Sequence, residues 1–223
     1  MPLKWDAEGA GGDGRTWEGV GIVRGMDEKA TLHRYLRTRR ADLLAKLEGL
    51  DEYDARRPVT PTGTNLLGLV KHVASVELGY FGEVFGRPSL RALPWDAEDA
   101  EPDADLWAAP DETREEIVEL HHFAAAHSDA TIGALPLDAP GEVPWWPAER
   151  KHVTLHQILV HMCVETAQHL GHADILRELI DGSAGQRAGD PNLTTRTPEE
   201  WAAHRARIDA AARGAAQKLP GGK

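Results

Sequence analysis

The chain has 223 residues, and its 25 lysines and arginines against 36 aspartates and glutamates give a net charge of −11. This acidic balance disfavours nucleic acid and anionic membrane surfaces as partners, because both carry negative phosphate groups. The single cysteine, Cys163, excludes an intramolecular disulfide framework, and no apolar run approaches the roughly 20 residues of a membrane span. With no secretory signal pattern, these features predict a soluble protein of the cytoplasm.

Two amphipathic helices are predicted in the first part of the chain. The first begins after Asp27, and its apolar residues recur at intervals of three and four as far as Leu50. The loop DEYDARRPVTPTGT follows, with two prolines and a glycine that interrupt helical structure. The second helix is predicted to open at Thr64 or Asn65 and to end at the sequence FGRP.

Two further helices are predicted after an acidic, proline-containing crossover. The third begins near Glu112. The fourth begins with Thr154 and Gln157, which have the T-x-x-Q spacing of a capping box, and ends at Gly182. Four long amphipathic helices with one long crossover are typical of a four-helix bundle.

The predicted organisation is one all-α domain with extensions. Residues 1–25 are expected to form a flexible leader, and residues 26–185 the four-helix bundle. Residues 186–223 are expected to form a loop, a short C-terminal accessory helix and a frayed tail. No strand pattern is sustained anywhere in the sequence.

Polar residues interrupt the row of apolar residues that the fourth predicted helix turns toward the core, here called its inward stripe. Glu165 and His169 lie four residues apart, so their side chains project from the same face with Cβ atoms about 5–6 Å apart. His72 lies on the apolar face of the second helix. Bundles build metal sites from such residues on facing helices, so the sequence predicts a triad of His72, Glu165 and His169.

Two histidines and one carboxylate leave coordination positions open, which is typical of a catalytic zinc or a non-haem iron site. An ionised carboxylate in an apolar core costs several kcal/mol unless it is paired. No lysine or arginine falls on the inward stripe near Glu165, so a divalent cation is the simplest partner. The alternative is that Glu165 only forms hydrogen bonds with neighbouring histidines in a polar cavity.

His161 and His172 flank the triad on the same stripe of the fourth helix. They are predicted to act as hydrogen-bond partners of the ligands or as proton relays, and spacing alone allows either to replace a ligand. The histidines predicted to face solvent are His121, His122, His127, His152 and His156. The sequence identifies no partner for His33 or His204.

Three other features of the sequence bear on function. Cys163 lies beside the stripe without an activating cation, so it is predicted to pack rather than to react. Trp145 and Trp146 are expected either to line a pocket or to pack the end of the bundle. The motifs of serine hydrolases, nucleotide-binding loops and zinc proteases are absent from the sequence.

The segments TGTNLLGLVKHVASVELGYFGEVFGRP, VPWWP and LHQILVHMCVETAQHLGHADILRELIDG resemble the DinB-like metal-binding four-helix superfamily. The resemblance covers about residues 27–185 and is closest to the actinobacterial mycothiol-dependent transferase branch. Much of the superfamily has H-x-x-x-H followed by R-G-Q, whereas this chain has Glu165 in the first position and LGH in place of RGQ. The maleylpyruvate isomerase branch carries the same glutamate as a ligand, so the resemblance implies the ligands His72, Glu165 and His169.

The resemblance also implies a function. It points to a zinc-dependent S-transferase that activates mycothiol for attack on an electrophilic small molecule, with nickel, iron or manganese as alternative metals. A metal-dependent hydrolase or isomerase that uses bound water is the main alternative, and a non-enzymatic metal-binding stress-response bundle is another. A homodimer is left open.

Overall fold

The computed structural model describes residues 27–97, 99–186, 190 and 192–218, and the predicted leader at residues 1–25 lies outside this part. The described chain is mostly helical, which confirms the all-α class. Four long helices form the bundle: α1 (Glu28–Ala45), α3 (Leu66–Phe81), α4 (Arg114–Ala134) and α5 (Leu155–Asp181). None of the helices in the described ranges has the length and apolarity that a bilayer crossing requires.

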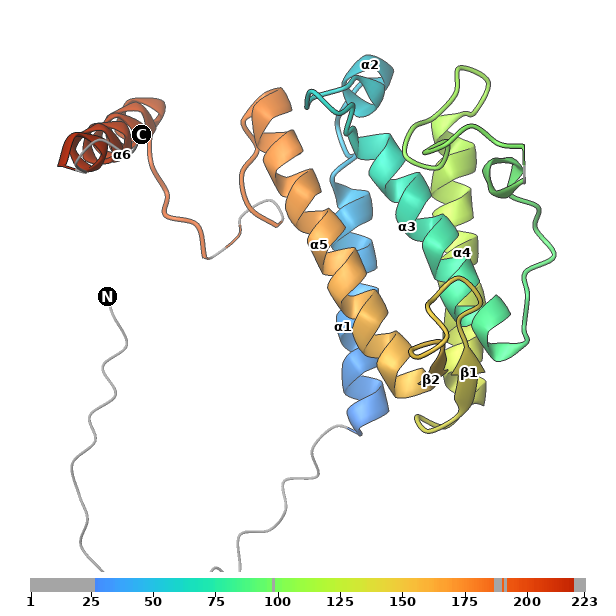
Figure 1. The fold of residues 1–223 in the computed structure, drawn as a ribbon. Helices are drawn as coiled ribbons and strands as arrows, with labels where there is room; N and C mark the ends of the chain where they lie inside the picture. Colours follow the sequence, from blue (N-terminus) through green and yellow to red (C-terminus); the bar gives the residue numbers. More distant parts are fainter. Residues whose placement is uncertain (1–26, 98, 187–189, 191, 219–223) are drawn as a thin grey trace, which may run out of the picture.

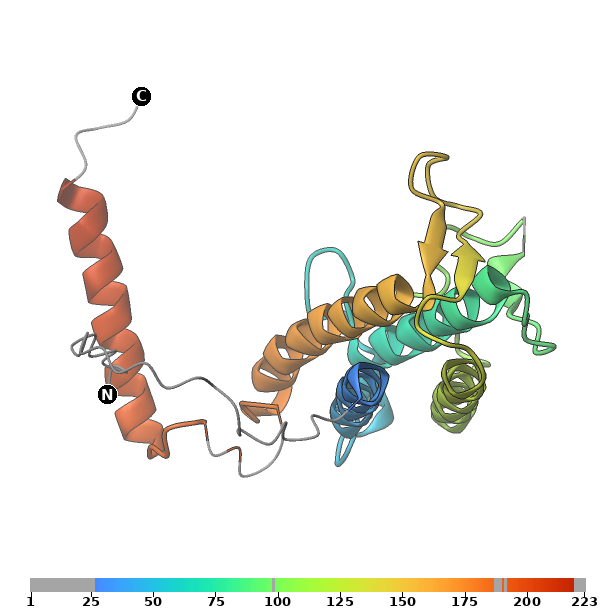
Figure 2. The ribbon, with the colours of Figure 1, turned by 90° about the horizontal axis from the view of Figure 1, so that it is seen from below.

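Helix α1 packs against α5, and α3 packs against both α4 and α5 (Figures 1 and 2). The crossover, predicted over residues 87–111, runs between α3 and α4 and returns the chain to the end of the bundle where α3 began (Figure 1). Helices α3 and α4 therefore run in the same direction. This arrangement leaves the crossover lying over the bundle, where it can contribute to a site.

The predicted helix ends are confirmed where capping residues specified them. The Asn65 side chain accepts a hydrogen bond from the Gly68 amide at the start of α3. Thr154 and Gln157 form the predicted capping box of α5, and Gly182 ends that helix with a left-handed φ of 80°. Helix α4 begins at Arg114, where Thr113 and Glu116 form a second capping box that the sequence analysis had not identified.

Several short elements were missed because they are too short to produce a periodic pattern. Helix α2 (Glu52–Arg56) lies in the segment predicted to be a loop, and 3₁₀ helices η1 (Glu83–Phe85) and η2 (Pro94–Asp96) lie in the crossover. Strands β1 (Pro140–Glu142) and β2 (His152–Thr154) pair antiparallel just before α5. The C-terminal helix, α6 (Pro198–Lys218), is longer than the short helix predicted there.

The bundle core contains three apolar clusters, and a polar layer separates the two larger ones. One cluster includes Leu43, Leu67, Val70 and Leu170, and the other includes Leu36, Phe81, Ile158 and Met162. On each bundle helix, a buried polar residue falls between the two clusters: Arg40 on α1, Glu77 on α3, Ser128 on α4 and Thr166 on α5. The polar residues therefore form a layer across the interior.

An ion pair between Arg40 and Glu77 forms the centre of this layer. Arg40 Nε donates to Glu77 Oε2 at 2.9 Å, and Arg40 Nη1 donates to Asp129 Oδ1 at 2.6 Å. Burial raises the pKa of the Glu77 carboxyl, and the Arg40 guanidinium opposes that rise. The pair links α1 to α3 and, through Asp129, to α4.

Replacing Arg40 with methionine should lower the free energy of unfolding by about 3 kcal/mol, because a buried carboxylate loses its main partner while the side-chain volume is nearly kept. Urea unfolding followed by circular dichroism at neutral pH measures the change. Lys151→Met is the control, because it removes the surface ion pair with Glu142 and should cost less than about 1 kcal/mol. Equal losses in the two variants would contradict a stabilising role for the buried pair.

Candidate metal centre

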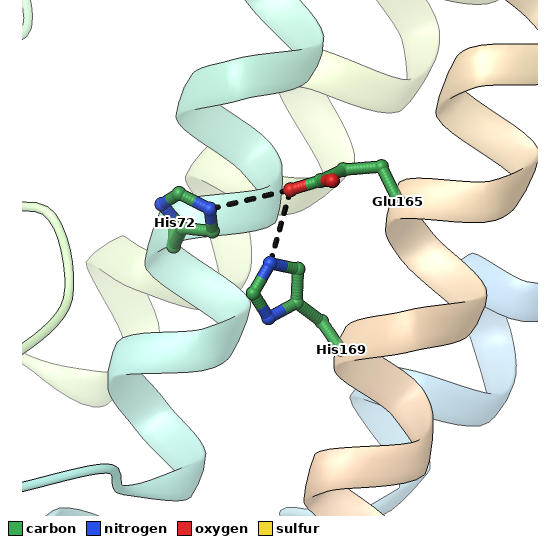
Figure 3. A group of neighbouring side chains, drawn as sticks. All are labelled: His72, Glu165 and His169. Carbon is green, nitrogen blue, oxygen red and sulfur yellow. Dashed lines mark hydrogen bonds and ion pairs between the residues drawn. The ribbon is translucent and has the colours of Figure 1, made fainter.

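The three predicted ligands converge where α3 and α5 lie side by side (Figure 3). Helix α3 presents His72, and α5 presents Glu165 and His169. Glu165 Oε1 lies 3.0 Å from His169 Nε2 and 3.5 Å from His72 Nε2. The two imidazole rings meet edge to face with their centroids 4.7 Å apart. All three side chains are partly buried.

This group could hold a metal ion, because one donor atom from each residue lies within 4.8 Å of the other two. The donor set fits a divalent transition metal, since imidazole nitrogen with one carboxylate oxygen is a common ligand combination for zinc and non-haem iron. The hydrogen-bonded alternative is also visible, since Glu165 contacts both histidines directly. The sequence-based expectation that the three residues share one site agrees with this geometry.

The orientation of His72 depends on Asp105, a crossover residue that the sequence analysis did not identify. His72 Nδ1 and Asp105 Oδ2 lie 2.6 Å apart. When Nδ1 carries the proton, it donates to the carboxylate and leaves the Nε2 lone pair facing Glu165 and His169. The only signal in the sequence was the acidic composition of the crossover, which does not distinguish Asp105 from its neighbours.

The charges around His72 and His169 shift their pKa values in opposite directions. Burial lowers the pKa of His72, but the hydrogen bond and charge of Asp105, together with Glu165, outweigh burial and raise it. Burial and the nearby charge of His72 lower the pKa of His169. The Asp105 pKa is lowered by its hydrogen bond with His72. His169 is therefore the more readily deprotonated of the two imidazoles.

The crossover is fixed to α3 by a buried lysine. Lys71 is 2% exposed, and its Nζ donates to the carbonyl oxygens of Ala104 at 2.8 Å and Trp107 at 3.0 Å. The same ammonium lies 2.7 Å from Glu112 Oε1. Because Ala104 and Trp107 flank Asp105, these bonds determine where the carboxylate lies relative to His72.

The backbone of α3 also approaches the crossover closely. A Cβ atom at Gly68 would lie 1.8 Å from the Leu106 carbonyl oxygen, so only glycine fits at this position. The Asn65 side-chain amide donates to the same carbonyl at 3.2 Å. Gly68 lies one helical turn before His72, so this close contact brings the neighbouring Asp105 within reach of the imidazole.

A cavity of about 540 Å³ adjoins the triad, and this volume suits a small-molecule ligand. Trp145 lines the cavity, as one of the two expectations for this pair had it. Trp146 packs against the apolar core, as the other had it. Both indole nitrogens lie within hydrogen-bonding distance of the Tyr80 hydroxyl, at 3.5 and 3.0 Å. The cavity is lined by Ser75, Val76, Gly79, Tyr80, Glu83, Asp96, Asp105, Trp145, His161 and Glu165.

The two flanking histidines have different surroundings. His161 lines the cavity, and its ring packs against Tyr80 and Trp146 at centroid distances of 4.6 and 5.2 Å. Burial lowers the pKa of His161. His172 is exposed, which corrects the prediction that it faces the core, and its ring lies 5.4 Å from that of His169. The next residue, Ala173, takes the buried position instead, and one residue corresponds to a rotation of about 100° around the helix.

His121 also corrects the sequence analysis, which predicted that it faces solvent. It is 4% exposed, and burial with the nearby Arg40 charge lowers its pKa to about 4. His121 lies next to Leu120 on the buried side of α4, in a helix whose many polar residues obscure the inward face. His122, His152 and His156 are exposed as predicted.

Two residues left without an assigned partner acquire one in the fold. His33 Nε2 lies 2.7 Å from Asp129 Oδ1, and His204 Nδ1 lies 2.8 Å from Arg207 Nη2. Cys163 is partly buried with a pKa raised by burial, and its thiol lies 3.5 Å from the Leu32 carbonyl oxygen. A raised pKa disfavours the thiolate, so these surroundings suit a packing residue.

Comparison with protein families places most of the chain in one of them. A family model described as mycothiol-S-transferase matches residues 31–182, which span nearly all of α1 and continue through the end of α5. No curated protein matches the chain. The matched range includes His72, Asp105, Glu165 and His169, so the family region contains the whole candidate centre.

Asp105→Asn should lower the pKa of His72 in metal-free protein, because the carboxylate charge that stabilises the imidazolium is removed. Titration of the imidazole resonances by NMR measures the shift, and Asp99→Asn, an exposed change in the same crossover, should leave it in place. An unchanged His72 titration in Asp105→Asn would contradict the assigned contact.

The same change should alter the pH dependence of stability. A histidine whose folded pKa is raised stabilises the fold fully below its unfolded value of 6.5, and this contribution is lost as the pH rises through the folded pKa. Between pH 5 and 9, the stability difference between wild type and Asp105→Asn should therefore be largest at the acidic end. Urea unfolding of metal-free protein across that range measures it.

Proposed function

Because the chain belongs to the mycothiol-S-transferase family, we propose that it is a metal-dependent enzyme that joins the sulfur of mycothiol to an electrophilic small molecule. Membership of the family implies a thiol substrate. The observation that supports metal dependence is the convergence of His72, Glu165 and His169 on one point beside the cavity. We propose zinc as the metal, with nickel, iron and manganese as alternatives that the same donors accept.

His72 Nε2, His169 Nε2 and a Glu165 carboxylate oxygen would hold the ion in this proposal. A bound divalent cation favours the thiolate form of a coordinating thiol and so supplies a strong nucleophile at neutral pH. Asp105 holds the His72 ring so that Nε2 faces the other donors.

In the transfer step, the mycothiol sulfur forms a bond to an electrophilic carbon, which loses a leaving group or, at a double bond, gains a proton on the adjacent carbon. We propose that an imidazole nitrogen of His161 accepts the thiol proton. His161 lines the cavity, and its lowered pKa keeps it neutral near pH 7, as a general base requires. His172, which was an equal candidate in the sequence analysis, is exposed and is not among the cavity-lining residues.

The net charge of the chain and the character of its helices bear on where the protein acts. Its net charge of −11 argues against binding to nucleic acid, and the described helices offer no membrane span. We therefore propose that it acts on small molecules in the cytoplasm.

Glu165→Ala should weaken zinc binding by more than the roughly 10–100-fold that loss of an outer partner of a ligand causes, because a direct donor is removed. Competition with a chromophoric chelator measures the affinity. Glu178→Ala is the matched control, since Glu178 lies on the same helix, is exposed and is outside the cavity lining. Equal, negligible zinc binding by wild type and Glu165→Ala would overturn the metal assignment.

The zinc-loaded protein should accelerate the loss of free mycothiol thiol in the presence of a neutral electrophile such as monobromobimane. Chelation of the metal should abolish this acceleration. His161→Gln should lower kcat by on the order of 100-fold if the imidazole is the base, while zinc affinity stays within a few-fold of wild type. Thiol titration and bimane fluorescence measure the reaction. No acceleration above the uncatalysed rate would overturn the transferase proposal, and hydrolysis without thiol loss would favour the water-using alternative.

A further inference from the structure

The cavity beside the triad is lined by acidic side chains, without a lysine or an arginine among its described lining residues. Four carboxylates line it, from Glu83, Asp96, Asp105 and Glu165. Among the described residues that line it, none is a lysine or an arginine. The lining imidazole, His161, has a pKa lowered by burial, so it adds no positive charge near neutral pH.

Two of these carboxylates already have partners in or beside the triad. Asp105 is hydrogen-bonded to His72, and Glu165 belongs to the triad. In the proposed holoenzyme, the charge of a divalent cation is matched by Glu165 and Asp105 together. Glu83 and Asp96 then remain as the uncompensated charges of the cavity, and neither forms an ion pair with any residue in the described part of the chain.

The uncompensated charges interact with one another. The Asp96 pKa is raised by partial burial, with further contributions from the charges of Asp105 and Glu83. Burial is the larger cause of this rise, and repulsion from the other two carboxylates adds to it. A cation placed between them would relieve that repulsion.

The rest of the lining includes two aromatic rings, beside the hydroxyl groups of Ser75 and Tyr80. Tyr80 and Trp145 lie with their ring centroids 5.3 Å apart, and the Trp145 side chain is half exposed. The faces of Trp and Tyr attract cations through their quadrupoles. Aromatic faces together with carboxylates form a site suited to an ammonium group, and repel a carboxylate or a phosphate.

We propose that the electrophile for this enzyme carries a positive charge, a protonated amine or a quaternary ammonium, which binds between Glu83, Asp96 and the Tyr80–Trp145 wall. This inference rests on the proposed function and extends it to the class of substrate. An acidic electrophile such as a dicarboxylic acid meets repulsion at the same place. Glu83 and Asp96 therefore determine specificity and take no part in the chemistry.

Three acrylamides with the same reactive double bond test the charge preference. Their N-substituents are 2-(trimethylammonio)ethyl, its neutral isostere 3,3-dimethylbutyl, and 2-carboxyethyl. In each case, the mycothiol sulfur bonds to the β carbon and the α carbon gains a proton. After division by the uncatalysed rate, kcat/KM should be at least about tenfold higher for the cation than for the neutral compound, and lowest for the anion. The preference should decrease as NaCl rises from 0.05 to 0.5 M.

Glu83→Gln combined with Asp96→Asn should bring the ratio of cationic to neutral kcat/KM close to one. The matched control is Glu115→Gln combined with Glu178→Gln, which removes the same two charges from exposed positions outside the cavity and should keep the ratio. A wild-type ratio of one overturns the inference. The inference is also overturned if the preference persists in the Glu83→Gln/Asp96→Asn variant, called the cavity variant, or if it falls equally in the control variant.

Binding of an unreactive cation separates this inference from the proposed function. Calorimetry of the zinc-loaded protein with choline and with its neutral isostere 3,3-dimethylbutan-1-ol requires no thiol and no turnover. Choline should bind at least about tenfold more tightly, and the cavity variant should lose the difference. If neither monobromobimane nor any acrylamide is consumed while choline binds selectively, the transferase proposal fails and the cation site stands. Equal binding, or none, overturns the cation site.

Discussion

The buried ammonium of Lys71 fixes the element on which the candidate centre depends. A helical bundle alone supplies His72, Glu165 and His169, but the partner of His72 Nδ1, Asp105, comes from the crossover. Lys71 holds an irregular part of the crossover against α3 through two carbonyl oxygens and Glu112. A buried ammonium requires such partners, because its desolvation is otherwise too costly. The crossover consequently supplies both Asp105 and part of the cavity wall.

Helix α3 carries polar groups on two sides, with His72 and Glu77 about 7.5 Å apart along its axis. Glu77 faces the interior, where it pairs with Arg40, and His72 faces the cavity beside α5. The two larger apolar clusters lie on either side of the polar layer that contains Glu77. A helix that rotated or slid would break the ion pair and the triad contacts together. The same packing that stabilises the bundle therefore defines the geometry of the candidate centre.

The sequence predicted the features that depend on helical periodicity and on local capping. The four helices, the ends at Asn65, Thr154 and Gly182, and the meeting of His72 with Glu165 and His169 all follow from spacings within one helix or between two facing stripes. Asp105 could not be predicted, because its place depends on a tertiary contact of an irregular segment. The β1–β2 hairpin was missed because three-residue strands leave no periodic pattern. The burial of His121 was missed because polar residues surround it in α4.

Gly68 links the evolution of two distant parts of the sequence. The crossover can approach α3 only while position 68 lacks a side chain. An acidic residue at position 105 contributes to the centre only when that approach is possible. In an alignment of relatives, glycine at the first position and an acid at the second should therefore be gained or lost together. A chain that keeps all three histidine and glutamate donors but has a larger residue at position 68 would have to orient its helix-α3 histidine by other means.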